Sequence, residues 1–193
     1  SVGPAQVGDE GVTFELYDGI GFDGELFETM HDLHFMSDLV SGAEFVLGVL
    51  EKTLPSEGVM IHVFDLNTQH YVVVRVIAPG ADKVLMHRVP DRDSLFEPVM
   101  RRMRSLRIDD AVRDGRFRTE RWTLAGVEVT SALCGPVQLA GRYLGMVELV
   151  NPQGGGTFYE SESNALDYIC EQFAEFLKNH PIVIDAELIL AQP

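Results

Sequence analysis

Arginine is concentrated in one stretch of a chain that is otherwise acidic. Of 193 residues, 15 are Lys or Arg and 30 are Asp or Glu, which gives a net charge of −15. The arginines of this stretch are Arg101, Arg102, Arg104, Arg107, Arg113, Arg116, Arg118 and Arg121. Guanidinium groups bind phosphate or carboxylate through paired hydrogen bonds, so the stretch suits a nucleotide ligand, an acidic partner or the chain's own acidic N-terminus. The interleaved Asp109, Asp110, Asp114 and Glu120 favour a solvated surface of mixed charge instead, and these alternatives stay open.

The histidines do not form a metal-binding pattern. His31 and His34 are three residues apart on an expected helix, close enough to share a ligand. Two ligands fall short of the usual three or four, so we expect no metal site. His62, His70 and His87 lie on expected strands, and we interpret them as surface or turn residues rather than as ligands of a haem.

Neither cysteine has the surroundings of a reactive thiol. A thiolate needs exposure and a basic neighbour, whereas Cys134 lies in an apolar strand and Cys170 on the apolar face of a helix. We interpret both as core residues, which argues against a thiol enzyme and against a thiol-anchored chromophore. The glycines at 154–156 lack the Lys and the Ser or Thr of a phosphate-binding loop, and no Ser-His-Asp order is present. We therefore expect no catalytic residues and no enzymatic activity.

Composition and charge restrict the partners and the compartment. A strongly acidic protein is repelled by DNA, RNA and anionic membranes, so we expect no nucleic-acid partner and no membrane partner. No apolar run approaches the roughly 20 residues that span a bilayer, and two cysteines in apolar segments suit a reducing compartment. These features predict a cytoplasmic protein. The chain begins at Ser1 rather than at Met, which suggests a fragment of a larger protein.

The pattern of the chain predicts a central hairpin followed by a long helix. Residues 129–139 and 143–150 are apolar runs, and the turn between them contains Gly141, which tolerates a positive φ. The helix is expected from Glu160 because apolar residues then recur every three or four positions. These residues are Ala165, Leu166, Ile169, Cys170, Phe173, Ala174 and Leu177.

The rest of the chain alternates between helical and strand-like patterns. Residues 26–54 predict two helices separated at Ser41-Gly42, and residues 94–106 predict a third helix that starts at Ser94. Period-two apolar patterning between turn-rich separators predicts strands at residues 58–66, 70–77 and 83–89. Residues 12–17 lie in an acidic, glycine-rich lead-in that favours a solvated segment, with a short strand as the alternative.

The motifs of the hairpin and helix resemble the C-terminal half of a GAF domain, a sensory fold of signalling proteins. The matching features are a polar-capped Ser, a strand with a late Pro, a glycine turn, a Gly-hydrophobic-Glu-hydrophobic-Asn strand, Gly-Gly-x-Phe and an acidic helix start. Here they are Ser131, Pro136, Gly141, residues 145–151, residues 155–158, and Glu160 with Glu162. The chain departs from the family at Tyr159, where a helix-capping Thr is common, and Ser161 is the expected substitute.

This resemblance implies an α+β fold. We expect a GAF-like, PAS-related central antiparallel sheet of about six strands, with the N- and C-terminal helices packed on one face. The implied organisation is an acidic, glycine-rich lead-in or linker at residues 1–25, a GAF-like domain at residues 26–180 and an apolar tail at residues 181–193. The tail is expected to add an edge strand or to contact a partner.

The resemblance also implies a function. We expect a non-catalytic sensory or regulatory module that binds a small molecule or nucleotide, or relays a signal by homodimerisation through its terminal helices; no particular cofactor is indicated. A ligand would lie between the sheet and residues 90–126. The residues expected to contact it are Phe64, Arg75, Arg88, Asp110, Phe117 and Trp122. The alternative is a ligand-free GAF-like scaffold that contacts another signalling protein, as expected if Phe, Trp and Met side chains fill that space.

Overall fold

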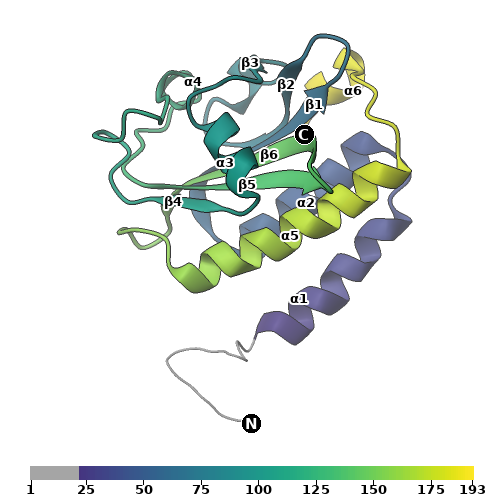
Figure 1. Cartoon of the computed structure of the whole chain (residues 1–193), viewed down its shortest axis with the longest axis horizontal. Helices are drawn as coiled ribbons and strands as arrows, with labels where there is room; N and C mark the ends of the chain where they lie inside the picture. The colour runs from purple at the N-terminus through teal and green to yellow at the C-terminus, as the bar shows by residue number, and fades with distance from the viewer. Residues whose placement is uncertain (1–21) are drawn as a thin grey trace.

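A computed structural model of the chain describes residues 22–193 and contains one six-stranded antiparallel sheet. The strands are β1 Ser56–Asp65, β2 His70–Ile77, β3 Arg88–Pro90, β4 Leu106–Ile108, β5 Ala132–Leu139 and β6 Arg142–Pro152. Their order across the sheet is β3-β2-β1-β6-β5-β4 (Figure 1). The two long hairpins, β1–β2 and β5–β6, therefore meet at the centre through β1 and β6. The alternative strand at residues 12–17 lies outside the described residues.

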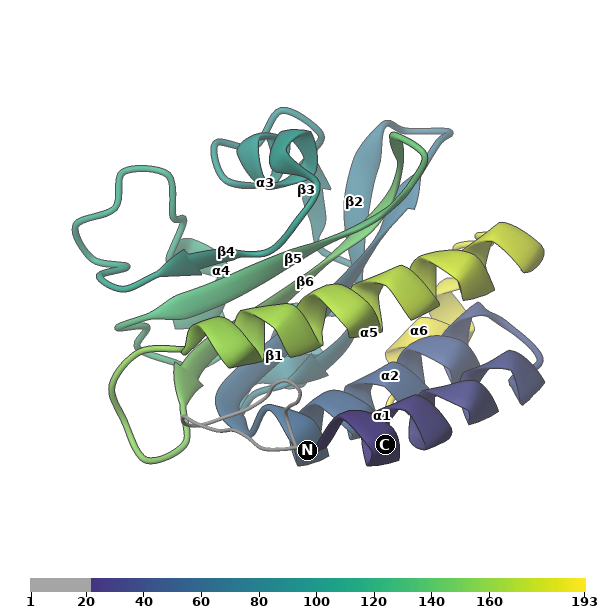
Figure 2. The ribbon, with the colours of Figure 1, turned by 60° about the horizontal axis from the view of Figure 1, so that its bottom comes forward.

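Helices cover the two faces of the sheet unequally (Figure 2). One face carries α1 Phe22–His31, the 3₁₀ turn η1 Asp32–Phe35, α2 Leu39–Thr53, α5 Glu160–Asn179 and α6 Ala186–Leu190. The other face carries two short helices, α3 Phe96–Arg102 and α4 Glu120–Leu124, joined by loops. A second 3₁₀ turn, η2 Ala81–Lys83, follows β2. The predicted α+β fold, with about six antiparallel strands and the terminal helices on one face, is confirmed. None of the described helices is long and apolar enough to cross a bilayer.

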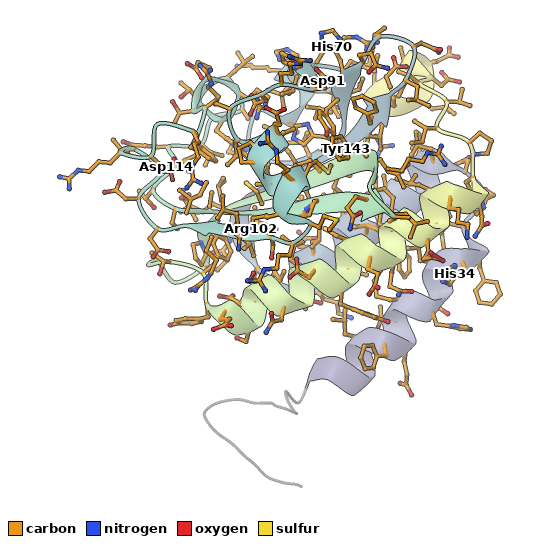
Figure 3. All side chains as sticks on the ribbon, in the orientation of Figure 1. His34, His70, Asp91, Arg102, Asp114 and Tyr143 are labelled. Carbon is orange, nitrogen blue, oxygen red and sulfur yellow. The ribbon has the colours of Figure 1, made fainter. Side chains whose placement is uncertain are left out.

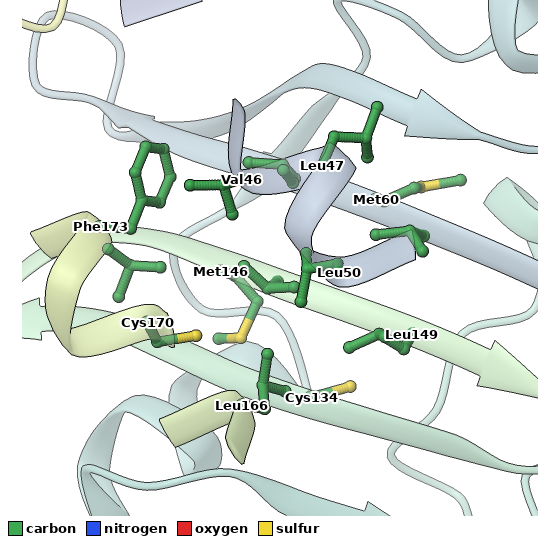
Figure 4. Packing of buried hydrophobic residues seen from close by; sticks show 14 of the residues in the cluster. Val46, Leu47, Leu50, Met60, Cys134, Met146, Leu149, Leu166, Cys170 and Phe173 are labelled. Atoms are coloured by element: carbon green, nitrogen blue, oxygen red, sulfur yellow. The ribbon is translucent and has the colours of Figure 1, made fainter. Parts of the chain in front are cut away.

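The helical layer packs closely on the sheet. Val46 and Leu50 of α2, and Leu166 and Phe173 of α5, lie over the central strands (Figure 4). Gly135 on β5 allows this approach, because a Cβ there would lie 2.8 Å from atoms of both Leu166 and Cys170. Both cysteines are fully buried, as the sequence predicts.

The break between the N-terminal helices was predicted at the wrong place. Ser41-Gly42 lies inside α2, and the break falls at residues 36–38. Asp38 caps α2: its Oδ1 accepts from the Ser41 amide at 2.8 Å, and its own amide donates to Ser41 Oγ at 3.2 Å. Gly42 is needed for packing, since a Cβ there would overlap the ring of Phe176 on α5.

Three further boundaries differ from the sequence prediction. Residues 83–87 form turns instead of a strand, and Met86 has a φ of 72°, which is incompatible with an extended chain. The helix predicted at 94–106 is shorter: α3 begins at Phe96, after a turn in which Asp93 Oδ1 accepts from the Leu95 amide at 2.8 Å, and Met103 ends it with a left-handed φ of 60°. The residues beyond it pair with β5 as β4. At the start of α5, Glu162 accepts from the Tyr159 amide at 2.7 Å, and Ser161 lies within the helix.

The C-terminal tail folds back onto the domain and does not add a strand. Asp185 caps α6 by accepting from the amides of Glu187 and Leu188 at 3.1 and 3.3 Å, and Ile189 is fully buried. The side-chain amide of Gln192 pairs with both backbone groups of Val76 at the edge of β2, at 2.9 and 2.7 Å. The tail thus protects an exposed length of sheet edge with one side chain.

Candidate functional site

Three ionisable side chains meet on the sheet face beneath α3 and α4. His62 comes from β1, Glu148 from β6 and Arg121 from α4. His62 Nε2 lies 2.9 Å from Glu148 Oε1, and Arg121 Nη2 lies 3.3 and 3.4 Å from the two oxygens of the same carboxylate. His62 and Glu148 are completely inaccessible to solvent, and the Arg121 side chain is 14% exposed. We call these three residues the buried triad, and residues 90–126 the cover.

The strand register brings the first two members together. Met60 pairs with Glu148 and His62 pairs with Met146, so His62 and Glu148 are diagonal neighbours on one face of the β1–β6 pair. A β-bulge between Ile61 and His62 in the pairing of β1 with β2 lies at the same position. Bulges re-aim side chains and are common beside functional sites.

Electrostatics keep the triad in one charge state near neutral pH. Burial favours a raised pKa for Glu148, but the charge of Arg121 and the hydrogen bond from His62 outweigh it and lower the pKa, so Glu148 is anionic. Burial lowers the pKa of His62 more than Glu148 raises it, so the imidazole is neutral. Because a carboxylate only accepts hydrogen bonds, the proton of His62 lies on Nε2 and the Nδ1 lone pair is left over.

Aromatic side chains fill the layer between the triad and the cover. The ring of Phe96, on α3, is fully buried and lies edge-on to the rings of His62 and Tyr71, at centroid distances of 4.9 and 5.1 Å. The guanidinium carbon of Arg121 lies 5.5 Å from the same ring centre. At the other end of β1, the Trp122 ring covers Gly58 so closely that a Cβ at that position would overlap it.

Four polar atoms in this layer are buried and have no hydrogen-bond partner within residues 22–193. They are His62 Nδ1, Tyr71 Oη, Arg121 Nε and Trp122 Nε1. A buried polar group without a partner lowers the free energy of unfolding by about 1–3 kcal/mol. Each of the four atoms therefore destabilises the fold unless another group forms a hydrogen bond with it. Phe and Trp side chains thus fill this space, as the ligand-free scaffold predicts, whereas the three donors and one acceptor left without partners among them are what a ligand site predicts.

The six residues predicted to bind a ligand are only partly brought together. Phe64 and Trp122 lie between the sheet and the cover, and Phe117 is also buried. Arg88 is the first residue of β3, and its side chain reaches the β1–β2 turn, where it pairs with Asp65 at 3.1 Å. Asp110 is exposed and its carboxylate lies 3.7 Å from Arg113.

Arg75 lies on the opposite face of the sheet from the buried triad. It pairs in register with Ile61, which faces the helices, and its Nε lies 2.7 Å from Glu44 on α2. Its Nη1 donates to the carbonyl oxygen of Ile189 in the tail at 3.0 Å. The structure therefore gives Arg75 a role in holding the tail and separates it from the other predicted residues.

The triad was not predicted from the sequence, because each of its three residues was assigned the environment that is most common for its residue type. His62 was expected at the surface and is fully buried, which corrects that interpretation. Glu148 is the single charge in the apolar run at 143–150, and a lone charge at an inward-facing position was the available signal. Arg121 was included only as one member of the arginine-rich stretch.

Most of the other arginines of that stretch form a mixed-charge surface. Arg101 pairs with Glu97, and Arg116 pairs with Asp114 at 2.7 Å. Arg102 on α3 and Asp114 in the following loop lie at the periphery of the cover (Figure 3). Arg121 is the exception, because it turns inward to the triad.

The remaining candidates for chemistry are accounted for by their surroundings. Burial raises the pKa of the Cys134 and Cys170 thiols well above the ordinary value, which disfavours the thiolate. The rings of His31 and His34 are 6.3 Å apart. Within residues 22–193, no group of three or more His, Cys, Asp or Glu side chains is placed to hold a metal ion.

Comparison with known proteins gives one family match and many structural matches. A model of the GAF domain family matches residues 38–177. No curated protein matches the chain. Among solved structures, the GAF domain of a phosphoenolpyruvate-protein phosphotransferase from Coxiella burnetii is 19% identical, with a TM-score of 0.67, 80% of this chain covered and 90% of that one.

Two other similar structures come from sensory proteins. A methyl-accepting chemotaxis protein fragment is 14% identical, with a TM-score of 0.64, 78% of this chain covered and 95% of that one. The chromophore-binding domain of a bacteriophytochrome from R. palustris is 14% identical, with a TM-score of 0.61, 82% of this chain covered and 61% of that one. At these identities, the likeness shows a shared fold.

Proposed function

Because the chain belongs to the GAF domain family, whose members occur in signalling and sensory proteins and are generally not catalytic, we propose that it is a non-catalytic sensory module. In this proposal a small molecule binds between the sheet and the cover, against the buried triad. The observation that carries the proposal is the set of four buried polar atoms without partners in this layer. An interior that served only for packing would gain stability by replacing such atoms with apolar ones.

Native mass spectrometry tests this proposal directly. The protein, incubated with a small-molecule extract of the cells that express it, is measured under native and then denaturing conditions. We expect an added mass that disappears on denaturation. Glu148→Gln should abolish the added mass, whereas Glu44→Gln, on the opposite face of the sheet, should retain it. A bare mass throughout, or equal retention by both variants, would contradict ligand binding at the triad.

A second candidate function is a scaffold that acts through protein contacts, and the outer surface of the helical layer favours it. A groove of about 480 Å³ runs between α1 and α2, with Leu26, Phe45 and Val49 among its lining residues. Phe27 on α1 and Phe35 in the η1 turn are 52% and 75% exposed. Large exposed apolar side chains of this kind are common at interaction sites.

Sedimentation analysis distinguishes the scaffold from the ligand module. If the terminal helices pair two copies, the protein sediments as a dimer and Phe27→Glu converts it to a monomer. Leu66→Glu is the control, because Leu66 is equally exposed but lies on the β1–β2 hairpin. A monomer at every concentration would reject pairing through these helices.

The proposal that the protein is not a thiol enzyme rests on the burial of both cysteines, Cys134 and Cys170. Buried cysteines with raised pKa values should react with an alkylating reagent only as fast as the protein unfolds. Rapid modification of Cys134 in the folded protein would instead favour a thiol enzyme.

A further inference from the structure

Phe96 is surrounded by polar groups that its ring cannot satisfy. His62, Tyr71 and Arg121 all contact this one ring, and each of them carries a buried atom without a hydrogen-bond partner within residues 22–193. The phenyl ring offers its face to the guanidinium in a cation–π contact. It offers no lone pair and no N–H or O–H group, so the polar atoms gain nothing else from it.

We propose that Phe96 occupies, from within the chain, the place of a small, neutral, planar aromatic ligand that carries at least one hydrogen-bond acceptor. The ligand enters when α3 moves outward and withdraws the Phe96 ring. This inference rests on the proposed ligand-binding function and adds the class of ligand and the side chain that it displaces.

The contacts of Phe96 define the shape of the ligand. A flat ring in its position receives the same edge contacts from His62 and Tyr71 and the same guanidinium contact from Arg121. Aromatic pairs in this edge-to-face arrangement attract each other beyond the effect of the area that they bury. An aliphatic chain would lose these contacts.

The polar atoms define the functional groups of the ligand. Tyr71 Oη and Arg121 Nε can donate, so an acceptor on the ring satisfies either of them. His62 Nδ1 carries a lone pair, so a ring N–H or O–H is also accommodated. A heteroaromatic ring with an acceptor at one edge and a donor at another meets both requirements.

The charge of the triad excludes an ionic ligand. Glu148 and Arg121 carry opposite charges within 3.3 Å, and His62 is neutral. The buried charges of the triad therefore sum to zero before a ligand binds. An anion or cation would add an unpaired charge to a buried space, which costs several kcal/mol.

The attachment of α3 allows the movement. The helix has seven residues, Phe96–Arg102, and only Phe96, Val99 and Met100 of them are buried. Helices this short are not stable by themselves and depend on packing for their position. Just before the helix, the Ser94 hydroxyl donates to the carbonyl oxygen of Arg116 at 2.8 Å. This hydrogen bond links the start of α3 to the loop that contains Arg116, so we expect the two to move together.

The test uses Phe96→Ala with three probes of similar size: phenol, benzene and benzoate. Removal of a buried ring leaves a cavity that accepts a single aromatic molecule. We expect Phe96→Ala to bind phenol about tenfold more tightly than benzene, because one hydrogen bond is gained, and to bind benzoate least. The unmodified protein should bind phenol at least about tenfold more weakly than the variant, since Phe96 competes for the space.

Phe173→Ala is the matched control. Phe173 is also fully buried but lies on α5, on the apolar face of the sheet, so its cavity should bind phenol no more tightly than benzene. Isothermal titration calorimetry measures all the affinities. Equal binding of phenol and benzene by Phe96→Ala would overturn the proposal, as would equal phenol affinities of that variant and the unmodified protein.

Two further measurements apply if Phe96→Ala does not fold or does not favour phenol. If Phe96→Ala does not fold, Phe96→Leu leaves part of the space open, and phenol should raise its Tm more than that of the unmodified protein; no difference would count against the proposal. An added mass in the native spectrum of the unmodified protein would uphold ligand binding even if Phe96→Ala failed to favour phenol. In that case only the assigned position and ligand class would be wrong.

Discussion

At the scale of single residues, the buried triad is the least expected feature of this interior. Glu148 and His62 lie on the central strands of a sheet whose other inward residues are mostly apolar, and Arg121 reaches them from α4. Such a group stabilises the protein only while it is complete. Removing one partner leaves an uncompensated charge, which is far more costly than the pair is favourable.

The first prediction concerns Arg121. Arg121→Met leaves Glu148 buried without its cation, and we expect the free energy of unfolding to fall by about 2–4 kcal/mol. Arg101→Met removes an exposed pair with Glu97 on α3 and should cost about 0.5 kcal/mol or less. Urea denaturation at neutral pH measures both variants. Similar losses would mean that Glu148 does not depend on Arg121.

The second prediction concerns His62 and pH. Burial lowers the pKa of His62 in the folded protein below its ordinary value of 6.5, so below that pH the unfolded chain binds a proton that the folded protein does not. Stability should therefore fall as the pH drops from 7 to 5, by at most about 1.4 kcal/mol per pH unit from this group. Glu148 adds no loss there, because its pKa is also lowered and its contribution declines only at more acidic pH.

His62→Gln should flatten this dependence, since glutamine does not titrate. His34→Gln, at an exposed position, is the control and should leave the slope unchanged. Unfolding free energies measured between pH 7 and pH 5 give the slopes. An unchanged slope in His62→Gln would assign the pH dependence to other groups.

At the scale of elements, the two glycines of α2 illustrate how packing overrides local preference. Both positions are helical, where alanine is favoured by about 1 kcal/mol. Gly42 lies against the Phe176 ring of α5, whereas a Cβ at Gly48 would meet no atom within 4 Å. The same substitution should therefore act in opposite directions at positions six residues apart.

We predict that Gly42→Ala destabilises the protein and Gly48→Ala stabilises it. The first change forces α2 and α5 apart at a cost of about 1–3 kcal/mol, which exceeds the gain in helix propensity. The second change gains up to about 1 kcal/mol without a steric penalty. Thermal unfolding of the two variants measures the difference. If Gly42→Ala were also stabilising, α2 and α5 would be less closely packed than they are here.

At the scale of the whole molecule, the tail extends the helical layer beyond the residues that match the family. The match ends at residue 177, whereas α6 and Gln192 lie further along the chain and return to β2. Arg75 joins the two parts, because it contacts Glu44 of α2 and the carbonyl oxygen of Ile189. One of the residues predicted to bind a ligand thus contacts the end of the chain.

The fourth prediction is that Gln192→Ala loosens the tail without unfolding the domain. The substitution removes both hydrogen bonds to Val76, so backbone amides of residues 186–190 should exchange hydrogen about tenfold faster or more. Amides of β1 and β6 should be unaffected. Glu187→Ala, at an exposed position on α6, is the control. Unchanged exchange in Gln192→Ala would show that the buried Ile189 side chain and the Arg75 hydrogen bond to its carbonyl oxygen secure the tail without Gln192.

The sequence by itself determined the fold class, the hairpin–helix order and most element types. These features depend on local patterning: apolar periodicity, a glycine turn at residue 141 and the amphipathic face of α5. The helical break at residues 36–38 was also encoded locally, in the capping residue Asp38, but several residues near it could have served as the cap. Where such a helix begins depends on which of the nearby polar side chains forms the capping hydrogen bond.

Only the tertiary structure decided the site. His62, Phe96, Arg121 and Glu148 are separated by up to 86 residues, and their meeting depends on the β1–β6 register and on where the cover closes. A shift of one residue in that register would turn Glu148 toward the helices. Arg75 shows the same dependence, since its face of the sheet follows from its pairing with Ile61. Composition and periodicity describe each strand separately, whereas a site of this kind exists only between strands.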